Sequence, residues 1–267
     1  MIKHVFSQQN RALLAELVRT DFKLRYQGSM LGYAWSLLRP LLIFLILYIV
    51  FVRFLRFGGD VPHFPIYLLL GIVLWQFFSD MTSQSLGSVV GRGDLIRKIR
   101  IPRWIIVLSS SVSALINFGL NLLVVFVFMI FNEVPLTHNI IWFPVILVEI
   151  YVFALGLSLF LSAAYVKYRD MSYIWEVIIQ ALFYLTPILY PLSLIPNPTY
   201  QKILLMNPMA QAIQDARNVL VTTETTTIAE VYGEPFIRVA VMALVVVVFV
   251  VGVLYFRREA KQFAENL

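Results

Sequence analysis

Long apolar segments recur along this 267-residue chain, and they limit the folds that it can adopt. A run of about eighteen mostly apolar residues is long enough to cross a bilayer as a helix. Inside hydrocarbon, each segment must satisfy its own backbone hydrogen bonds, which a helix does. The runs are continuous rather than alternating, which disfavours a membrane β-barrel. The sequence therefore predicts an all-α polytopic membrane protein.

Composition supports this class of protein. Hydrophobic residues make up 60% of the chain and charged residues only 13%, whereas about a quarter of the residues in a soluble domain are charged. The formal net charge of +6 agrees with basic loops on the cytoplasmic side of a membrane, so nucleic acid is not an expected partner. Cysteine is absent and the three histidines lie far apart along the chain, so no metal site is expected.

Six membrane spans are predicted, at about 35–55, 66–86, 105–131, 141–166, 174–186 and 235–256. If both termini are cytoplasmic, 16 of the 21 Lys and Arg residues fall at cytoplasmic positions, which agrees with the positive-inside rule. We expect one domain over residues 1–267, comprising a cytoplasmic interfacial segment (1–33), a six-helix membrane domain (34–256) and a cytoplasmic tail (257–267).

Two segments outside the spans are predicted to form short helices with particular positions. Residues 10–25 place apolar and polar side chains on opposite helical faces, which is typical of a helix in the membrane interface. Residues 94–101 follow helix-breaking glycines, and Asp94 can cap this second helix. Its apolar edge would comprise Leu95 and Ile99, and its basic edge Arg97, Lys98 and Arg100.

Proline interrupts the fifth apolar region. Four prolines, the first of them Pro187, fall within residues 174–205, and such a density cannot form one straight helix. We therefore expect the fifth span to end near residue 186 and short re-entrant helices to follow it. Residues 208–222 are predicted to form a polar surface helix.

The chain lacks the common motifs of catalysis. It contains no Gly-x-x-x-x-Gly-Lys-Ser/Thr loop, so it cannot hydrolyse ATP by that route. Asp80, Glu149 and Glu176 fall in or near spans, and an ionisable residue at membrane depth suggests a function. Glu149 is the best candidate for a proton-binding group, although helix packing is the commoner role.

Aromatic residues recur at helical spacing in the first two spans. They are Phe44, Tyr48, Phe51, Tyr67, Trp75 and Phe78. A sugar ring stacks its C–H faces on aromatic planes, so an aromatic wall suits a moving glycan. With Tyr184 of the fifth span, these residues are candidates for lining a translocation passage. The alternative is that they pack against lipid or neighbouring helices.

Four stretches of the chain resemble one family of membrane proteins. They are residues 21–26 (DFKLRY) with Gly28, Gly32, Trp35 and Pro40; residues 94–99 (DLIRKI) with Pro102; Tyr168-Arg169-Asp170; and residues 183–190 (FYLTPILY) with Asn207, Pro208 and Arg217. In this order, on a six-span topology, they resemble the permease subunit of bacterial ABC-2 type exporters. That branch of the family exports O-antigen, teichoic acid and capsular polysaccharide.

The resemblance implies a transporter of the bacterial inner membrane rather than an enzyme. A homodimer of this chain would assemble with two copies of a separate ATPase, which would bind ATP and Mg²⁺, so this chain would need no cofactor. The cargo would be a lipid-linked polysaccharide, moved among membrane lipids. Residues 94–101 would be the coupling helix that the ATPase grips. The opening for the lipid head group would be bordered by Arg25, Tyr26, Gly28 and Gly32.

Some alternatives stay open on the residues alone. Gly28 and Gly32 match the spacing for close helix contact, but a bend before the first span is equally compatible. An ion-coupled secondary transporter would usually show broken helices in both halves, whereas only the fifth region is heavily broken. A membrane enzyme acting on lipid-linked sugars would need Asp, His or Arg clustered at one face, and no such cluster is evident.

Overall fold

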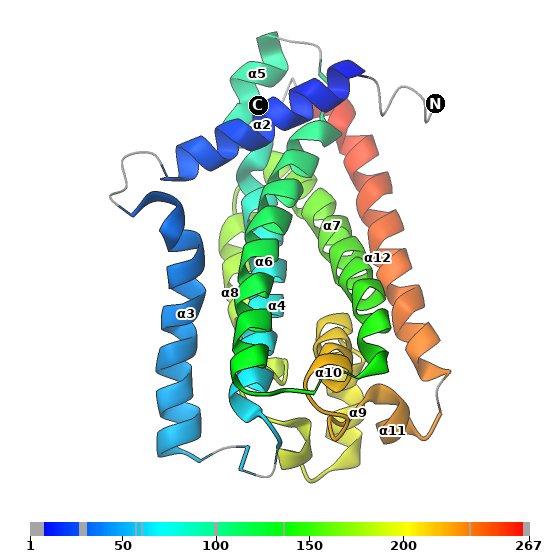
Figure 1. The fold of residues 1–267 in the computed structure, drawn as a ribbon. Helices are drawn as coiled ribbons and strands as arrows, with labels where there is room; N and C mark the ends of the chain where they lie inside the picture. Colours follow the sequence, from blue (N-terminus) through cyan, green and yellow to red (C-terminus); the bar gives the residue numbers. More distant parts are fainter. Residues whose placement is uncertain are drawn as a thin grey trace.

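Helices account for the regular structure in the described part of this chain. The computed structural model describes residues 8–26, 31–56, 58–59, 61–98, 101–135, 137–234 and 236–263. Long helices stand side by side in a bundle, and α2 (Gln8–Tyr26) lies across one end of it (Figure 1). The last helix, α12 (Ile237–Glu259), finishes at that same end. The predicted all-α class and the helix at residues 10–25 are confirmed for these residues.

The helices of the bundle follow one another through short connections. The long elements are α3 (Trp35–Leu47), which continues as the π-helical segment η2 (Tyr48–Phe54), α4 (Phe64–Ser88), α6 (Trp104–Phe131), α7 (Phe143–Lys167), α8 (Met171–Leu185) and α12. The short elements are η1 (Gly32–Ala34), η3 (Val90–Arg92), α5 (Gly93–Lys98), η4 (His138–Trp142), η5 (Leu192–Leu194), α9 (Pro198–Leu205), α10 (Pro208–Leu220), α11 (Ile228–Tyr232) and η6 (Ala260–Gln262). Each predicted span therefore agrees with its helix to within a few residues.

Five helical stretches among the described residues are long and apolar enough to cross a membrane, beginning at Trp35, Phe64, Trp104, His138 and Ile237. The remaining expected span, the fifth along the chain, corresponds to α8 and has only 15 residues, which is about 22 Å of helix against a hydrocarbon core of about 30 Å. It ends at Leu185 because Pro187 disfavours a helical residue before it, and Thr186 is extended. The predicted break in this region is confirmed.

α4 forms the centre of the bundle. Most of its side chains are apolar, as expected of a helix largely surrounded by others, and 78% of its most apolar stretch is buried. It packs mainly against α6 and α7. By contrast, only 11% of the corresponding stretch of α3 and η2 is buried, and α3 stands at the edge of the bundle (Figure 1). Side chains of α4 can therefore meet several helices, whereas α3 presents only one face to the bundle.

α7 and α12 approach each other closely at a pair of glycines. A Cβ atom added at Gly252 would lie 2.1 Å from the carbonyl oxygen of Gly156. One added at Gly156 would lie 2.6 Å from the Cα atom of Phe249. Small residues allow membrane helices to pack backbone against backbone in this way. This contact holds the last helix against the rest of the bundle.

α10 is buried, so the prediction of a polar surface helix at residues 208–222 is wrong. Most of its side chains are buried, including those of Gln211, Gln214 and Arg217. The helix packs against α7 and α4, in the half of the bundle away from α2 (Figure 1). Gln214 and Arg217 hydrogen-bond to α4, and Gln211 hydrogen-bonds to Asp215 of the same helix, as buried polar groups generally do.

Candidate functional site

A polar cleft of about 380 Å³ lies between α3, α4 and α6. Gln76, Asp80 and Gln84 of α4 line it, and their spacing of four residues places them on one face of the helix. Asn117 and Asn121 of α6 line it with the same spacing. Polar side chains at membrane depth are costly unless they pair or face water. Their clustering makes this cleft the leading candidate for a functional surface.

Hydrogen bonds hold several of these side chains in place. Gln76 Nε2 donates to Asp80 Oδ1 at 2.8 Å, and both side chains are partly buried. Asn121 Nδ2 donates to the carbonyl of Asn117 at 2.8 Å and to that of Ser36, on α3, at 3.3 Å. The second bond joins α6 to α3. The cleft is therefore a defined arrangement rather than a loose gap between helices.

Both signs of charge are present in the cleft, because Arg39 of α3 lines it together with Asp80 of α4. Among the polar side chains that line the cleft, only Asp80 is selected from the sequence as a candidate functional residue. The signal that could have revealed the rest is the four-residue polar spacing, which recurs on two consecutive spans. Glu176, another carboxylate selected from the sequence, is exposed on α8 and lies outside the cleft.

The aromatic residues of the first span lie at the junction of α3 and η2 with α6. Phe44 is buried, and its ring centre lies 6.0 Å from that of Phe128 on α6 and 5.9 Å from that of Tyr48. Tyr48 and Phe51 are partly buried and pack against the same apolar core. These three predicted passage residues therefore lie near one another.

The other predicted passage residues have different surroundings. Trp75 and Phe78 are buried and line an apolar cavity of about 300 Å³ between α4, α7, α8 and α12. Tyr67 is also buried, whereas Tyr184 is 63% exposed on α8. The structure thus brings Trp75 and Phe78 together and leaves Tyr67 and Tyr184 apart from them. Their role in lining a passage stays a prediction.

The predicted coupling segment forms a short helix, α5, at the end of the bundle that carries α2 (Figure 1). The helix begins at Gly93, so Asp94 lies in its first turn rather than at its cap. Its side chain still favours the positive helix N-terminus. Asp94, Arg97 and Lys98 are exposed, so charged groups of both signs are available to a partner. Two further predicted residues, Ile99 and Arg100, lie outside the described part of the chain.

Ile96 is the residue that anchors α5 to the bundle. It is buried in an apolar cluster with Val89, Val107 and Phe263, whereas Leu95 is only partly buried. The sequence predicts Leu95 and Ile99 as the apolar edge but does not single out Ile96. The distinction matters because a buried anchor holds the helix in place, while a partly exposed Leu95 can contact another protein.

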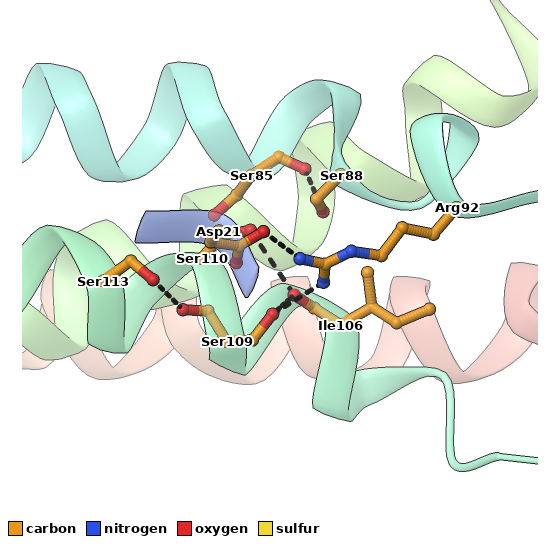
Figure 2. A network of polar contacts seen from close by, with 8 residues as sticks. All are labelled: Asp21, Ser85, Ser88, Arg92, Ile106, Ser109, Ser110 and Ser113. Atoms are coloured by element: carbon orange, nitrogen blue, oxygen red, sulfur yellow. Dashed lines mark hydrogen bonds and ion pairs between the residues drawn. The ribbon is translucent and has the colours of Figure 1, made fainter. Parts of the chain in front are cut away.

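Arg92, just before α5, connects three parts of the chain (Figure 2). Its Nη1 donates to Ser109 Oγ on α6 at 2.7 Å, and its Nη2 pairs with Asp21 Oδ1 on α2. Ser109 Oγ in turn donates to the carbonyl of Ile106 at 2.8 Å. Both members of the ion pair are partly buried, with side chains 17% and 21% exposed. Arg92 therefore links the segment just before α5 directly to α2, so that a displacement of this segment would act on α2.

The residues predicted to border the lipid opening are only partly described. Gly28 and the side chains of Arg25 and Tyr26 lie outside the description. Gly32 has a φ of +48°, a left-handed conformation that glycine adopts readily. Apart from its neighbours in the chain, no described residue has an atom within 4 Å of the position that its Cβ would occupy. For Gly32 these findings support a bend before α3, and not a close helix contact.

Arg217 of α10 is the largest fully buried side chain among the described residues. The sequence places it on a polar surface helix, and this predicted exposure is wrong. Its guanidinium donates to the carbonyls of Tyr67, Pro187 and Ile188 at 2.9, 2.6 and 2.7 Å. It also donates to Gln214 Oε1 at 3.0 Å. One side chain therefore fastens α10 to both α4 and the turn that ends α8.

Glu149 of α7 lies close to an ion pair. Asp215 of α10 accepts a hydrogen bond from Gln211 at 2.9 Å and pairs with Arg238 of α12 at 3.1 Å. Glu149 is buried, and its carboxylate oxygens have no hydrogen-bond partner among the described residues. Asp215 and Arg238 are close enough to interact electrostatically with its carboxyl group. The sequence identifies Glu149 as a candidate but not these neighbours, which come from helices far along the chain.

Comparison with known proteins gives a consistent result. The sequence profile described as ABC-2 type transporter matches residues 12–221. The chain is 30% identical to the O-antigen export system permease protein RfbA of Myxococcus xanthus, over 97% of this chain and 96% of that protein. A protein of the same name from Klebsiella pneumoniae is 31% identical over 77% of this chain and 79% of its own length. The polysialic acid transport protein KpsM of Escherichia coli is 22% identical over 81% of this chain and 84% of that protein.

Proposed function

The chain belongs to the ABC-2 type transporter family, and we propose that it is the permease subunit that exports a lipid-linked cell-envelope polysaccharide. Relatives named for O-antigen export and polysialic acid transport support a polysaccharide cargo. The observation that carries the proposal is the polar cleft between α3, α4 and α6. A hydroxyl-rich glycan needs hydrogen-bonding groups along its route, because leaving them unpaired in an apolar setting is costly.

The proposed topology has six spans with both termini in the cytoplasm. α8 and the turn after it would make the fifth crossing, and α9 and α10 would form re-entrant elements on the outer side. Two observations support this arrangement: α2 and the end of α12 lie at one end of the bundle (Figure 1), and the basic residues Arg97, Lys98, Arg257 and Arg258 lie in helices that reach it. The positive-inside rule assigns that end to the cytoplasm.

The proposed assembly is a homodimer of this chain with two copies of a nucleotide-binding ATPase, in the bacterial inner membrane. ATP and Mg²⁺ would be bound by the ATPase. α5 would be the coupling helix, since it projects from the end of the bundle with Asp94, Arg97 and Lys98 exposed. The ion pair between Arg92 and Asp21 would carry its movement to α2, which would border the opening for the lipid head group.

Depletion of the protein in its host tests this function. We expect lipid-linked glycan to accumulate facing the cytoplasm, measured by lectin labelling of spheroplasts before and after permeabilisation. Wild-type protein should restore export, and it should do so only when the partner ATPase is active. Normal surface glycan in depleted cells, or a chemically altered lipid-linked glycan inside them, would contradict the proposal; the second result would favour an enzyme.

An ion-coupled transporter is the second candidate function, and Glu149 is the observation that favours it. A buried carboxyl beside the ion pair of Asp215 and Arg238 is the kind of group that a proton-driven transporter uses. Purified protein in liposomes with a proton gradient and no ATPase distinguishes the two. ATP-dependent export predicts no transport there and near-normal export by Glu149→Gln in cells. Gradient-driven transport that Glu149→Gln abolishes would support the second function instead.

A further inference from the structure

A second cavity, of about 460 Å³, opens beside the end of α12. Its walls include Trp104 at the start of α6, Leu159 of α7, and Val253 and Phe256 of α12. Its volume falls in the range of about 300–1,000 Å³ that is usual for ligand pockets. It shares no lining residue with the polar cleft, and α12 and α3 stand on opposite sides of the bundle (Figure 1). The proposed transport route does not use this cavity.

Charge and apolar surface are separated along the length of this cavity. Val253 and Arg257 both line it from α12, four residues apart, and a helix rises about 6 Å over that distance. Lys261, in η6, continues in the same direction past the end of α12. The apolar side chains of Leu159 and Val253 therefore lie deeper in the bundle than Arg257 and Lys261, which lie at its end. An amphiphile with an apolar tail and an anionic head group is complementary to this arrangement, with its tail against the apolar residues and its head group near the cations.

The cations that line the cavity are Arg103, Arg257 and Lys261, and none of its described lining residues is acidic. Glu259 lies between Arg257 and Lys261 in sequence, but it is largely buried and its carboxylate lies 3.7 Å from Arg258 instead. The charge at the mouth of the cavity is thus strongly positive. An anion is the complementary partner, and a phosphate can accept hydrogen bonds from such cations.

The part of the cavity wall formed by Ala260 and Lys261 of η6 is held in place by side-chain contacts. Arg103 Nη1 donates to the carbonyl of Ala260 in η6. Phe263 is only 1% exposed, and its ring packs edge-on against that of Phe256 with 5.4 Å between the ring centres. These contacts position η6 and the basic residues on it. The cavity is therefore a built feature of this end of the bundle.

We propose that this cavity binds one anionic phospholipid of the surrounding leaflet. An acyl chain lies against Leu159, Val253 and Phe256, and the phosphate lies near Arg257 and Lys261, two of the three cations at its mouth. Anionic lipids gather on the cytoplasmic leaflet, where each nearby basic residue strengthens binding by about fivefold, which is about 1 kcal/mol. The bound lipid joins the start of α6, next to α5, to the end of α12. This proposal does not depend on the identity of the exported cargo.

Native mass spectrometry of the full chain tests it. The protein is reconstituted in vesicles of equal parts phosphatidylglycerol and phosphatidylcholine, extracted in mild detergent, and its retained lipids are counted. We expect one retained phosphatidylglycerol per chain, in clear excess over phosphatidylcholine. Arg257→Gln should lower that retention about fivefold. Val253→Phe should lower it without changing any charge, because the added ring fills the space of the acyl chain.

Two matched controls lie on the same helix. Arg258→Gln removes an equal charge from a residue that does not line the cavity, and Val250→Phe adds the same bulk at a position that is 45% exposed. Both should retain lipid as the wild type does. Equal retention of the two lipids, equal effects of Arg257→Gln and Arg258→Gln, or no effect of Val253→Phe would overturn the proposal. Loss of ATPase co-purification with unchanged lipid selectivity would also overturn it, because the cavity would then be a protein contact.

Discussion

The guanidinium carbon of Arg217 lies 3.6 Å from the centre of the Tyr67 ring, although the two residues are 150 positions apart. The same guanidinium donates to the carbonyl of Tyr67 at 2.9 Å, so both the ring and the backbone of α4 hold it. Its Nη2 donates to the carbonyl of Ile188 at 2.7 Å. A buried cation needs such complete pairing, because an unpaired charge inside a protein is very costly. Arg217 thereby determines where α10 sits in the bundle.

Space for this guanidinium is provided by Gly71. A Cβ added there would lie 2.3 Å from Arg217 Nη2, so Gly71→Ala should displace the group that bonds to Ile188. We expect a loss of about 1.5–3 kcal/mol in stability, the size of one hydrogen bond from a charged donor. Thermal unfolding of the purified chain in detergent measures it. Gly119→Ala is the matched control, because outside its own stretch of helix no described atom lies within 4 Å of its Cβ position and alanine favours a helix. Equal destabilisation by both changes would contradict the prediction.

The link between α2 and the segment before α5 is tested by a double-mutant cycle at Asp21 and Arg92. Asp21→Asn and Arg92→Gln should each lower thermal stability, and the double variant should lose less than their sum. The expected coupling free energy is about 1 kcal/mol, since both groups are partly buried and in contact. A coupling energy near zero would show that the pair contributes nothing to the attachment of α2. Loss of export by the single variants at normal abundance would connect the pair to function.

Leu95→Asp tests the coupling role of α5. A charge cannot enter an apolar contact cheaply, and loss of a packed anchor costs about 2 kcal/mol or more of binding, which is roughly thirtyfold in affinity. We expect the variant to insert normally but to lose co-purification of the ATPase. Met171→Asp is the control, because Met171 is also partly buried and begins α8. Full ATPase binding and full export by Leu95→Asp would show that α5 does not couple to the ATPase.

If the polar cleft is part of the transport route, a glutamine that lines it should matter for export and a glutamine outside it should not. Gln84→Leu removes a hydrogen-bonding side chain from the cleft and should reduce export about fivefold, from about 1 kcal/mol per lost hydrogen bond. Gln180→Leu makes the same change at an exposed position on α8 outside the cleft and should have no effect. Export is measured as surface glycan per unit of assembled complex. If the two variants behave alike, the cleft is not part of the route.

Tyr48 offers the clearest test of the aromatic residues. It is only partly buried, so Tyr48→Ala should spare the fold, whereas Trp75→Ala would open a cavity in the core and cost about 3–5 kcal/mol. Aromatic stacking contributes about 1–3 kcal/mol per ring with nucleic-acid bases, and sugars are expected to gain less. We expect reduced export by Tyr48→Ala and near-normal export by Tyr48→Phe, which keeps the ring. Normal export by both would remove Tyr48 from the passage.

The sequence by itself determined the helices. A continuous apolar run at α6 or α12 has few alternatives in a membrane, because only internal hydrogen bonding satisfies its backbone. The break after α8 was equally predictable, since Pro187 acts on the residue before it through local sterics. The short helix α5 was also found, because the glycines before it and Pro102 after it act within a few residues. Each of these results depends on neighbours in the chain.

Tertiary structure alone decided what the polar residues do. Gln214 and Arg217 resemble a solvated surface in sequence, yet they are buried because Tyr67 of α4 bonds to both and the turn after α8 accepts from Arg217. Asp21 and Arg92 meet from 71 positions apart. No local pattern distinguishes a polar side chain that faces water from one that finds a distant partner. Such pairings exist only after the helices have packed. They determine the position of the cleft, the burial of Arg217 and the contact between Arg92 and α2.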